Sequence, residues 1–344
     1  MDLFELTRVL VDIESVTNDE ARVGEFLFRH LTPVAAKYGG HVERMEVEAE
    51  RFNVFASWGE PVVTLSTHMD TVPPFFASRE DDQFLSGRGA CDAKGIIAAM
   101  ICAVEKLLAE SISDLGLLFV VGEERNSAGA RVAAKNPRGS RYLVNGEPTE
   151  DKLCLASKGA LRLELAANGR LAHSGYPELG RSAIDALLDV LEDIRRLPLP
   201  EDALLGKSTL NIGTICGGRA PNVVADEARA ELMFRLVSDA APVRAAVHEA
   251  VAGRVDVREV LHTPVFRFSA LDGLPTTVVA FTTDVPTLQE TWGTPFLIGP
   301  GSIQLAHTAE ERISKRELRD AVQIYASMVK RLLGSRPEAS GKFQ

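Results

Sequence analysis

The sequence predicts an α/β protein of two domains, with one domain inserted into the other. Three observations support this prediction. The chain has 344 residues, which is more than one domain usually holds. Buried-looking strands alternate with helices up to about residue 150, a pattern typical of a mainly parallel sheet. From about residue 157 the order becomes β-α-β-β-α-β, which is ferredoxin-like, and short α/β elements then return.

The outer domain is predicted to cover residues 1–156 and 267–344. Apolar residues at helical spacing, followed by a glycine pair at 39–40, indicate two helices near the N-terminus. The most apolar helix is predicted at 93–110, where large aliphatic side chains form a wide face. Pattern and flanking turns place the other elements: strands at 41–47, 52–58, 61–67, 115–121 and 141–145, and helices near 127–135 and at 315–333.

The inserted domain is predicted at 157–266. Its first segment alternates apolar and polar residues like a half-buried strand, and the next shows the period of an amphipathic helix. The complete series is a strand at 158–169, a helix at 181–197, strands at 208–218 and 227–237, a helix at 241–253 and a strand at 255–263.

Composition narrows the classes of protein. A net charge of −10 and a pI near 5.3 argue against a nucleic-acid binder, which normally carries a basic face. The N-terminus lacks the charge pattern of a signal peptide, and no apolar run is long enough to span a membrane. The four cysteines form no C-x-x-C pair, so we expect reduced thiols in a cytoplasmic protein. The polar segment 335–344 is expected to be disordered.

Residues that can bind metal follow the predicted strands. The carboxyl ends of strands in an open α/β sheet border the ligand crevice, so side chains from separate strands can converge there. Two more candidates lie in glycine-containing loops. The set is His68 and Asp70 after strand 61–67, Glu123 and Glu124 after strand 115–121, Glu147 after strand 141–145, Asp92 in the loop GRGACDAKG, and His307 beyond the loop GPGSI.

The residue types favour zinc. Two histidines with several carboxylates and no cysteine suit a borderline divalent ion, and a catalytic zinc takes about three protein ligands. If Asp92 bridges two metals, each metal gains three ligands, and Glu123 remains as a general base. Each residue alone also has an ordinary interpretation. Asp92 can cap the following helix, and the pair Glu123–Glu124 can form a solvated turn.

Several segments resemble the signature segments of a known family. They are STHMDTVPP at 66–74, GRGACDAKG at 87–95, the Glu-Glu pair after an apolar strand, NGEPT at 145–149 and GPGSIQLAHTAEE at 299–311. Together they resemble the two-zinc amidohydrolases that include acetylornithine deacetylase, succinyl-diaminopimelate desuccinylase and glutamate carboxypeptidase. The resemblance covers nearly the whole chain. It implies a zinc-peptidase-like catalytic domain and an inserted ferredoxin-like lid that also forms a homodimer.

The resemblance also implies a role for each matched position. In the family a glutamate at position 147, rather than an aspartate, tends to accompany deacylases and carboxypeptidases. The segment between the lid and GPGS looks short, with little room for the family's usual connecting helix. The implied roles are His68 and Glu147 on the first zinc, Glu124 and His307 on the second, Asp92 as the bridge, Asp70 as the carboxylate that orients His68, and Glu123 as the general base.

The lid matches the family at further positions. His173, in the segment LAHSGYP, resembles a histidine that reaches the neighbouring subunit's site and hydrogen-bonds the oxyanion. Asn222 and Arg235 resemble substrate-binding residues, and an arginine suits a substrate carboxylate because its planar fork binds it bidentately. Gly301 either lets the loop backbone approach the substrate or makes a tight turn.

We therefore predict a metal-dependent hydrolase that cleaves the amide bond of an N-acylated amino acid. An N-acetylornithine deacetylase-like activity is the first choice. Succinyl-diaminopimelate desuccinylase and a dipeptidase or carboxypeptidase are the alternatives within the family. Two Zn²⁺ ions are the expected cofactors, with Co²⁺ or Mn²⁺ possible. The expected partners are a small N-acyl amino acid or short peptide and a second copy of the chain, with no nucleic acid or membrane. An alternative of another class is a non-catalytic metal-binding module.

Overall fold

A computed structural model describes residues 1–334. The segment 335–344, which was predicted to be disordered and ends the predicted outer domain, lies outside the described residues. The chain forms two compact units. Unit 1 comprises Met1–Leu155, Phe268–Thr277 and the chain from Thr283 onward, and unit 2 comprises Ala156–Arg267 and Val278–Thr282. Among the helices in residues 1–334, none combines the length and hydropathy needed to cross a bilayer.

Most of a mixed sheet lies in unit 1; its strand order is β1-β2-β6-β3-β7-β17-β8-β15, and β16 pairs with β8. The neighbours β6, β3, β7 and β17 are parallel, whereas the strands toward both edges are antiparallel. The predicted mainly parallel sheet is therefore confirmed. The strands are β1 (His41–Glu48), β2 (Arg51–Trp58), β3 (Val63–His68), β6 (Leu115–Val120), β7 (Tyr142–Asn145), β8 (Leu153–Ser157), β15 (Phe266–Arg267), β16 (Thr276–Val279) and β17 (Thr294–Leu297).

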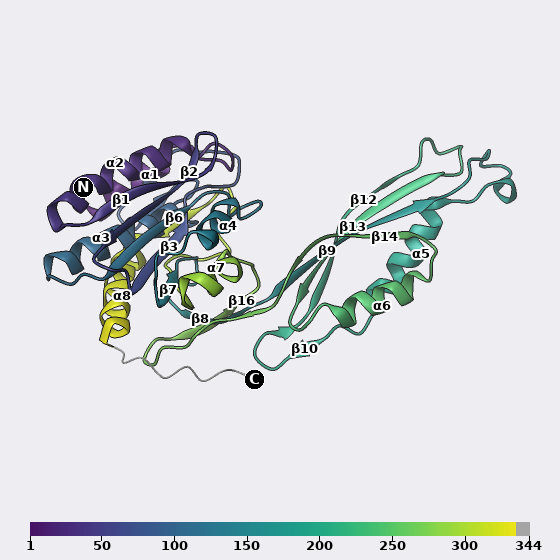
Figure 1. Cartoon of the computed structure of the whole chain (residues 1–344). Coiled ribbons are helices and arrows are strands. Elements are labelled where there is room, and N and C mark those ends of the chain that lie inside the picture. Colours follow the sequence, from purple (N-terminus) through teal and green to yellow (C-terminus); the bar gives the residue numbers. More distant parts are fainter. Residues whose placement is uncertain (335–344) are drawn as a thin grey trace. The chain divides into compact units, whose positions relative to one another are not determined.

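Helices cover both faces of this sheet (Figure 1). Successive residues of a strand point to opposite faces, so Leu117 joins the larger core and Leu118 the smaller one. The segment between the lid and GPGS, expected to have little room for a connecting helix, does contain one, because α7 lies there and supplies Trp292 to the smaller core. The larger core packs against α1 (Leu3–Asp12), α2 (Ala21–Tyr38), α3 (Lys94–Ala109) and α8 (Lys315–Gly334), and the smaller against α4 (Ala128–Lys135) and α7 (Val285–Trp292).

A small antiparallel sheet, ordered β18-β5-β4, joins two distant parts of unit 1. Strands β4 (Arg79–Glu80) and β5 (Phe84–Ser86) form a hairpin just before the loop GRGACDAKG. Strand β18 (Arg312–Ser314) comes from the segment just after the predicted ligand His307. The sheet therefore holds the two ligand-bearing loops beside each other.

Unit 2 contains the predicted ferredoxin-like order, which is confirmed. Its sheet is antiparallel with strand order β12-β13-β9-β14, and α5 and α6 share its apolar core. A short hairpin, β10 (Glu201–Asp202) and β11 (Gly206–Lys207), and a 3₁₀ turn at Pro177–Leu179 interrupt the connections. The main elements are β9 (Gly159–Asn168), α5 (Ala183–Arg195), β12 (Thr209–Gly217), β13 (Glu227–Leu236), α6 (Ala241–Val251) and β14 (Asp256–Thr263).

Candidate active site

His68 ends strand β3 and is almost completely buried. Its Nδ1 lies 3.0 Å from the backbone oxygen of Asp70, and its Nε2 lies 2.9 Å from Oδ1 of Asp92. An N–H on Nδ1 would donate to that backbone oxygen and leave the lone pair of Nε2 directed toward Asp92. Metal-binding histidines are commonly oriented in this way.

Asp92 lies between two pairs of possible ligands. On one side, Nε2 of His68 is 2.9 Å from Oδ1 of Asp92 and 4.0 Å from Oε2 of Glu147. On the other side, Nε2 of His307 is 3.4 Å from Oδ2 of Asp92 and 2.9 Å from Oε1 of Glu124. The structure thus brings together all five residues predicted as metal ligands. Their grouping matches one bridging carboxylate with one histidine and one glutamate on each side.

Asp70 connects the groups around this centre. Its carboxylate accepts hydrogen bonds from the backbone N–H groups of Glu123 and Glu124, at 3.1 and 3.2 Å, and from the hydroxyl of Thr17 at 2.8 Å. It also lies 3.5 Å from Nδ1 of His68. Asp70 is fully buried, so these contacts hold four neighbouring groups in fixed positions. The backbone of the predicted base, Glu123, is anchored here.

The centre concentrates carboxylates away from water. Burial and the nearby carboxylate of Glu147 hold the pKa of Glu123 well above its usual range. Burial likewise raises the pKa of Glu147 well above its usual range, although His68 opposes this. Hydrogen bonds to Asp92 and Glu124 raise the pKa of His307 to about 10. Each shift shows that the groups need additional positive charge to share this space.

A divalent cation fits this donor set. His68, Asp92 and Glu124 each offer a ligand atom, and these atoms all lie within 4.8 Å of one another. Imidazole nitrogens and carboxylate oxygens without a thiolate suit zinc and similar ions. The residues that would hold two such ions are His68, Glu147, Asp92, Glu124 and His307.

Glu311 is a functional residue that the sequence interpretation missed. It is buried, and its Oε1 accepts hydrogen bonds from the backbone N–H groups of Gly89, Cys91 and Asp92, at 2.9, 3.1 and 3.1 Å. Its Oε2 pairs with the buried guanidinium of Arg88. Glu311 thereby fixes the loop that carries Asp92. Its position four residues after His307, in the segment HTAEE, was the available signal.

Replacing Glu311 by glutamine is expected to lower the free energy of unfolding by about 3–5 kcal/mol, because it leaves the buried cation of Arg88 without its partner. Urea unfolding of the purified variant measures this. The exposed neighbour Glu310 provides a matched control, and its change to glutamine is expected to alter stability by less than about 0.5 kcal/mol. Equal effects of the two changes would contradict the anchoring role.

Asp151 makes stability depend on pH. Burial, with the nearby carboxylates of Glu317 and Asp320, raises its pKa from 3.8 to about 7. Because the folded-state pKa is the higher one, the folded state loses stability as pH rises from about 4 to about 7. Asp151→Asn is therefore expected to stabilise the protein at pH 8, with a smaller gain at pH 5. Urea unfolding at both pH values tests this, and a gain independent of pH would contradict it.

Three predicted site residues lie in unit 2. His173 and Asn222 lie on adjoining loops, since the N–H of Ser174 donates to the backbone oxygen of Asn222 at 3.0 Å and His173 bridges to Val223. Asn222 precedes the first residue of β13, whereas Arg235 lies near its last residue. The distance along the strand from its first residue to Arg235 is roughly 25 Å. Unit 2 therefore brings His173 and Asn222 together and keeps Arg235 apart from them.

Gly301 has a structural reason to be glycine. Its φ is +84°, a left-handed conformation, and a Cβ atom there would lie 2.5 Å from Sγ of Cys91. The close approach of the two ligand-bearing loops requires this small residue. Its predicted contact with substrate stays a prediction.

The fold and the site define a metal-dependent hydrolase that acts on C–N bonds. The sequence pattern of Peptidase family M20/M25/M40 matches residues 64–331. The chain belongs to this family, which confirms the resemblance seen in its motifs.

Relatives and solved structures agree with this assignment. The chain is 36% identical to a peptidase M20 domain-containing protein of Schizosaccharomyces pombe, over 95% of this chain and 84% of the relative. It is 38% identical to a probable carboxypeptidase of Aspergillus flavus, over 96% and 87%. The aminopeptidase PepT of Bacillus cereus has a similar fold, with a TM-score of 0.79 at 20% identity over 96% and 98% of the two chains. So does an M20 family metallo-carboxypeptidase of Sulfolobus solfataricus, with a TM-score of 0.76 at 17% identity over 96% and 99%.

Proposed function

We propose that this protein hydrolyses an amide bond adjacent to a free carboxylate, with two zinc ions as cofactors. The observation that carries the proposal is the arrangement of His68, Glu147, Glu124 and His307 on two sides of Asp92, with Glu123 beside them. Two metal ions in such a centre polarise the scissile carbonyl and make water a better nucleophile near neutral pH. Co²⁺ or Mn²⁺ can replace zinc in the same donor set.

Glu123 carries the proton transfers in this proposal. Its raised pKa makes its carboxylate a stronger base than an ordinary glutamate, so it accepts a proton from the attacking water. It then passes that proton to the amine that leaves. Asp70 supports this role because it holds the backbone N–H of Glu123 at 3.1 Å.

The lid supplies groups for the substrate. Nδ1 of His173 accepts the N–H of Gly175 at 3.0 Å, so a neutral His173 carries its proton on Nε2, at an exposed position where it can donate to an oxyanion. Arg235 is half-buried, and burial lowers its pKa. Its guanidinium remains protonated, because an arginine does not lose its proton in a protein at ordinary pH. It is the proposed partner of the substrate carboxylate.

Two substrate classes fit a carbonyl next to a free carboxylate. The motif GPGSIQLAHTAEE favours an N-acyl amino acid, with N-acetylornithine first. The curated fungal relatives are called probable carboxypeptidases, which favours the C-terminal bond of a short peptide. Glu147 is compatible with both classes.

An amine-release assay distinguishes these substrates. Metal-reconstituted protein is incubated with N-acetylornithine, other N-acetyl amino acids, N-succinyl-diaminopimelate and C-terminally free or amidated dipeptides, each with and without a chelator. We expect chelator-sensitive release from one class and loss of turnover when the carboxylate is amidated. Absence of turnover across the whole panel, with two metals bound per chain, would overturn the proposed reaction and favour a non-catalytic metal-binding module.

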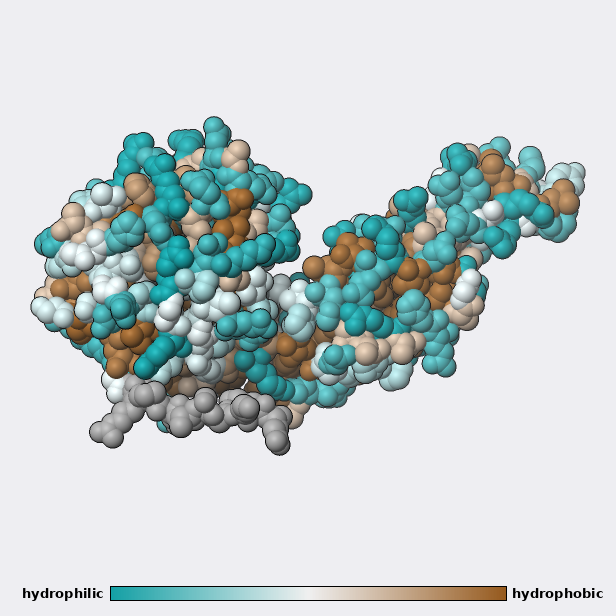
Figure 2. Space-filling view, in the orientation of Figure 1, coloured by the Kyte–Doolittle hydropathy of each residue, from teal (hydrophilic) through white to brown (hydrophobic). Residues whose placement is uncertain are grey.

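We further propose that the protein works as a homodimer formed through unit 2. His173 and Asn222 lie at one end of its sheet and Arg235 at the other, so one lid cannot bring all three to one substrate. Unit 2 also exposes apolar side chains, among them Leu188 and Leu261 at 50% and 47%. Figure 2 shows hydrophobic patches on the molecular surface. A substrate held by lids of two subunits satisfies both observations.

Complementation between subunits tests this arrangement. Glu123→Gln and His173→Ala are each expected to be inactive alone. In a mixed dimer, one site combines the intact Glu123 of one subunit with the intact His173 of its partner. A randomly mixed sample should therefore recover about one quarter of wild-type activity. A fully active monomer in sedimentation, or no recovery on mixing, would contradict the proposal.

A further inference from the structure

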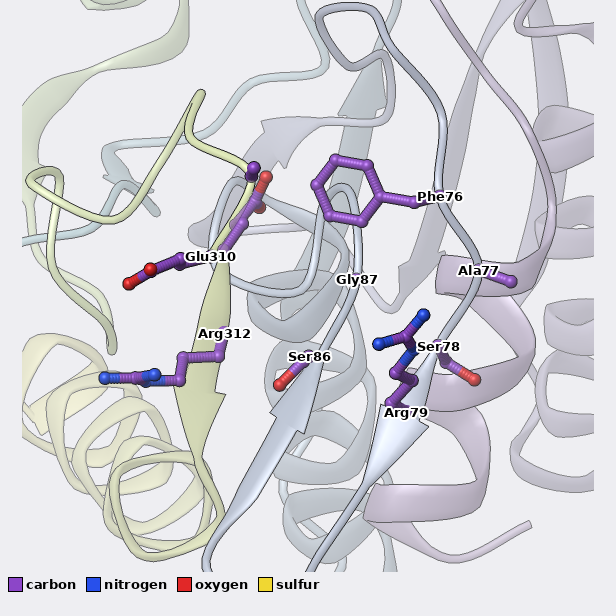
Figure 3. Close-up of a pocket in the computed structure, with 10 residues that line it drawn as sticks. Phe76, Ala77, Ser78, Arg79, Ser86, Gly87, Glu310 and Arg312 are labelled. Carbon is purple, nitrogen blue, oxygen red and sulfur yellow. The ribbon is translucent and has the colours of Figure 1, made fainter.

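Unit 1 contains a cavity of about 630 Å³, and none of the predicted metal ligands lines it. Three segments line it: residues 76–79 after the ligand loop of His68, residues 86–87 at the end of β5, and residues 309–312 at the start of β18. Phe76 forms an apolar part of the wall (Figure 3). Its polar lining contains two arginines, two serines and two glutamates, and one of the glutamates, Glu311, is already paired with Arg88.

The strand register places two arginines around one hydroxyl. Ser86 of β5 lies directly opposite Arg312 of β18 and directly opposite Arg79 of β4. Residues directly opposite each other in antiparallel strands point to the same face of the sheet. Figure 3 shows Arg312 and Arg79 on either side of Ser86, with the side chain of Arg312 extended away from it, so Arg312 must change rotamer to reach a ligand beside Ser86. Their strands are about 10 Å apart, a span that two long side chains can close around a small ligand.

Within residues 1–334, neither Arg79 nor Arg312 forms an ion pair. The Nε of Arg312 is buried without a hydrogen-bond partner among these residues, and its guanidinium carbon lies 5.1 Å from the ring centroid of Phe84. A buried donor of this kind costs free energy unless a ligand or water satisfies it. The pair therefore indicates an anion site.

Most nearby carboxylates are occupied by other partners. Glu80 pairs with Arg8 and Lys315, at 2.7 Å each, and Glu311 pairs with Arg88. Asp12 accepts both the N–H and the hydroxyl of Ser78, and Asp81 accepts two N–H groups of its own turn. Glu310 is the exposed acidic residue of the lining that opposes an anion.

We propose that this cavity binds a small molecule through a dianionic phosphoryl group. Two guanidinium forks and the hydroxyl of Ser86 provide donors for the three oxygens of a phosphoryl group. Phe76 offers an apolar surface for the organic part of such a ligand. The site is distinct from the proposed metal centre, because none of its lining residues is a predicted metal ligand, although Glu311 of the lining also holds the loop of Asp92.

Calorimetric titration of the metal-loaded protein with inorganic phosphate and with glycerol phosphate tests the assignment. Arg79→Ala and Arg312→Ala are each expected to weaken binding by at least about tenfold, since each removes a charged hydrogen-bonding partner. Arg316→Ala is the matched control, because this exposed arginine lies nearby in the sequence but outside the cavity lining. Its affinity is expected to equal that of the wild type.

One variant is expected to bind phosphate more tightly, which separates a change in the site from a loss of folding. Glu310→Gln removes the opposing charge and is expected to tighten phosphate binding severalfold, a result that misfolding cannot produce. Unchanged binding in both arginine variants would place the phosphate elsewhere, including at the metals, and would overturn the proposal. Acetate or succinate bound as tightly as phosphate would overturn the phosphoryl assignment.

Discussion

Replacing Glu123 by glutamine is expected to lower kcat at least about 100-fold while the metal content stays at the wild-type value. The amide keeps the size of the side chain but cannot accept a proton from water. The contacts of both histidines with Asp92 do not involve Glu123, so the metal ligands remain in place. Steady-state kinetics on the best substrate, together with elemental analysis of the same sample, measure both quantities.

The adjacent residue provides the control for this experiment. Glu124 lies 2.9 Å from Nε2 of His307, so Glu124→Gln should lower both metal content and activity. The two changes are chemically identical and occur at consecutive positions. A Glu123→Gln variant with near-normal kcat would exclude Glu123 as the base, and metal loss in that variant would make it a ligand instead.

Asp92→Ala is expected to reduce bound metal to less than one ion per chain and to lower kcat/KM at least about 1,000-fold. Its two carboxylate oxygens face both histidines, at 2.9 and 3.4 Å, so its removal weakens both metal positions together. Elemental analysis after dialysis and the amine-release assay measure the two effects.

The Asp92→Ala experiment needs one control for the specificity of the substitution and one for the folding of the variant. Asp82, an exposed aspartate in the β4–β5 hairpin, can be changed to alanine with no expected effect on metal or activity. Thermal unfolding of the Asp92 variant should remain cooperative, because removing one carboxylate from a crowded acidic centre relieves repulsion with Glu147. Retention of two metals in Asp92→Ala would contradict its bridging position.

Much of the fold could be predicted because its pattern is local. The apolar run predicted as helix 93–110 is α3 at Lys94–Ala109, and the buried run at 115–121 is β6 at Leu115–Val120. Period and length were sufficient for such segments. Helix α7 was missed because its eight residues give too short a window for helical periodicity, although a proline in its first turn and Gly293 at its end mark its limits.

In the candidate site, too, the residues in a local sequence pattern could be predicted and those that depend on distant contacts could not. The ligands at or shortly after strand ends, His68, Glu124 and Glu147, could be predicted because strand ends converge in an open sheet. The anchoring role of Glu311 could not, since its N–H partners lie about 220 positions earlier in the chain. The pairing of Arg79 and Arg312 across Ser86 depends on a register that local sequence does not encode.

The position of β17 affects the order in which this protein folds during synthesis. This strand lies between β7 and β8 in the sheet of unit 1, yet it follows the sheet of unit 2 in the chain. At ~5–20 residues per second, the ribosome needs on the order of 10–30 s to pass from the end of β7 to β17. Unit 2 can complete its sheet on the nascent chain during that interval. Until β17 is made, the edge of β7 that pairs with it stays unpaired and exposed. We therefore expect the nascent chain to need chaperones most during this interval.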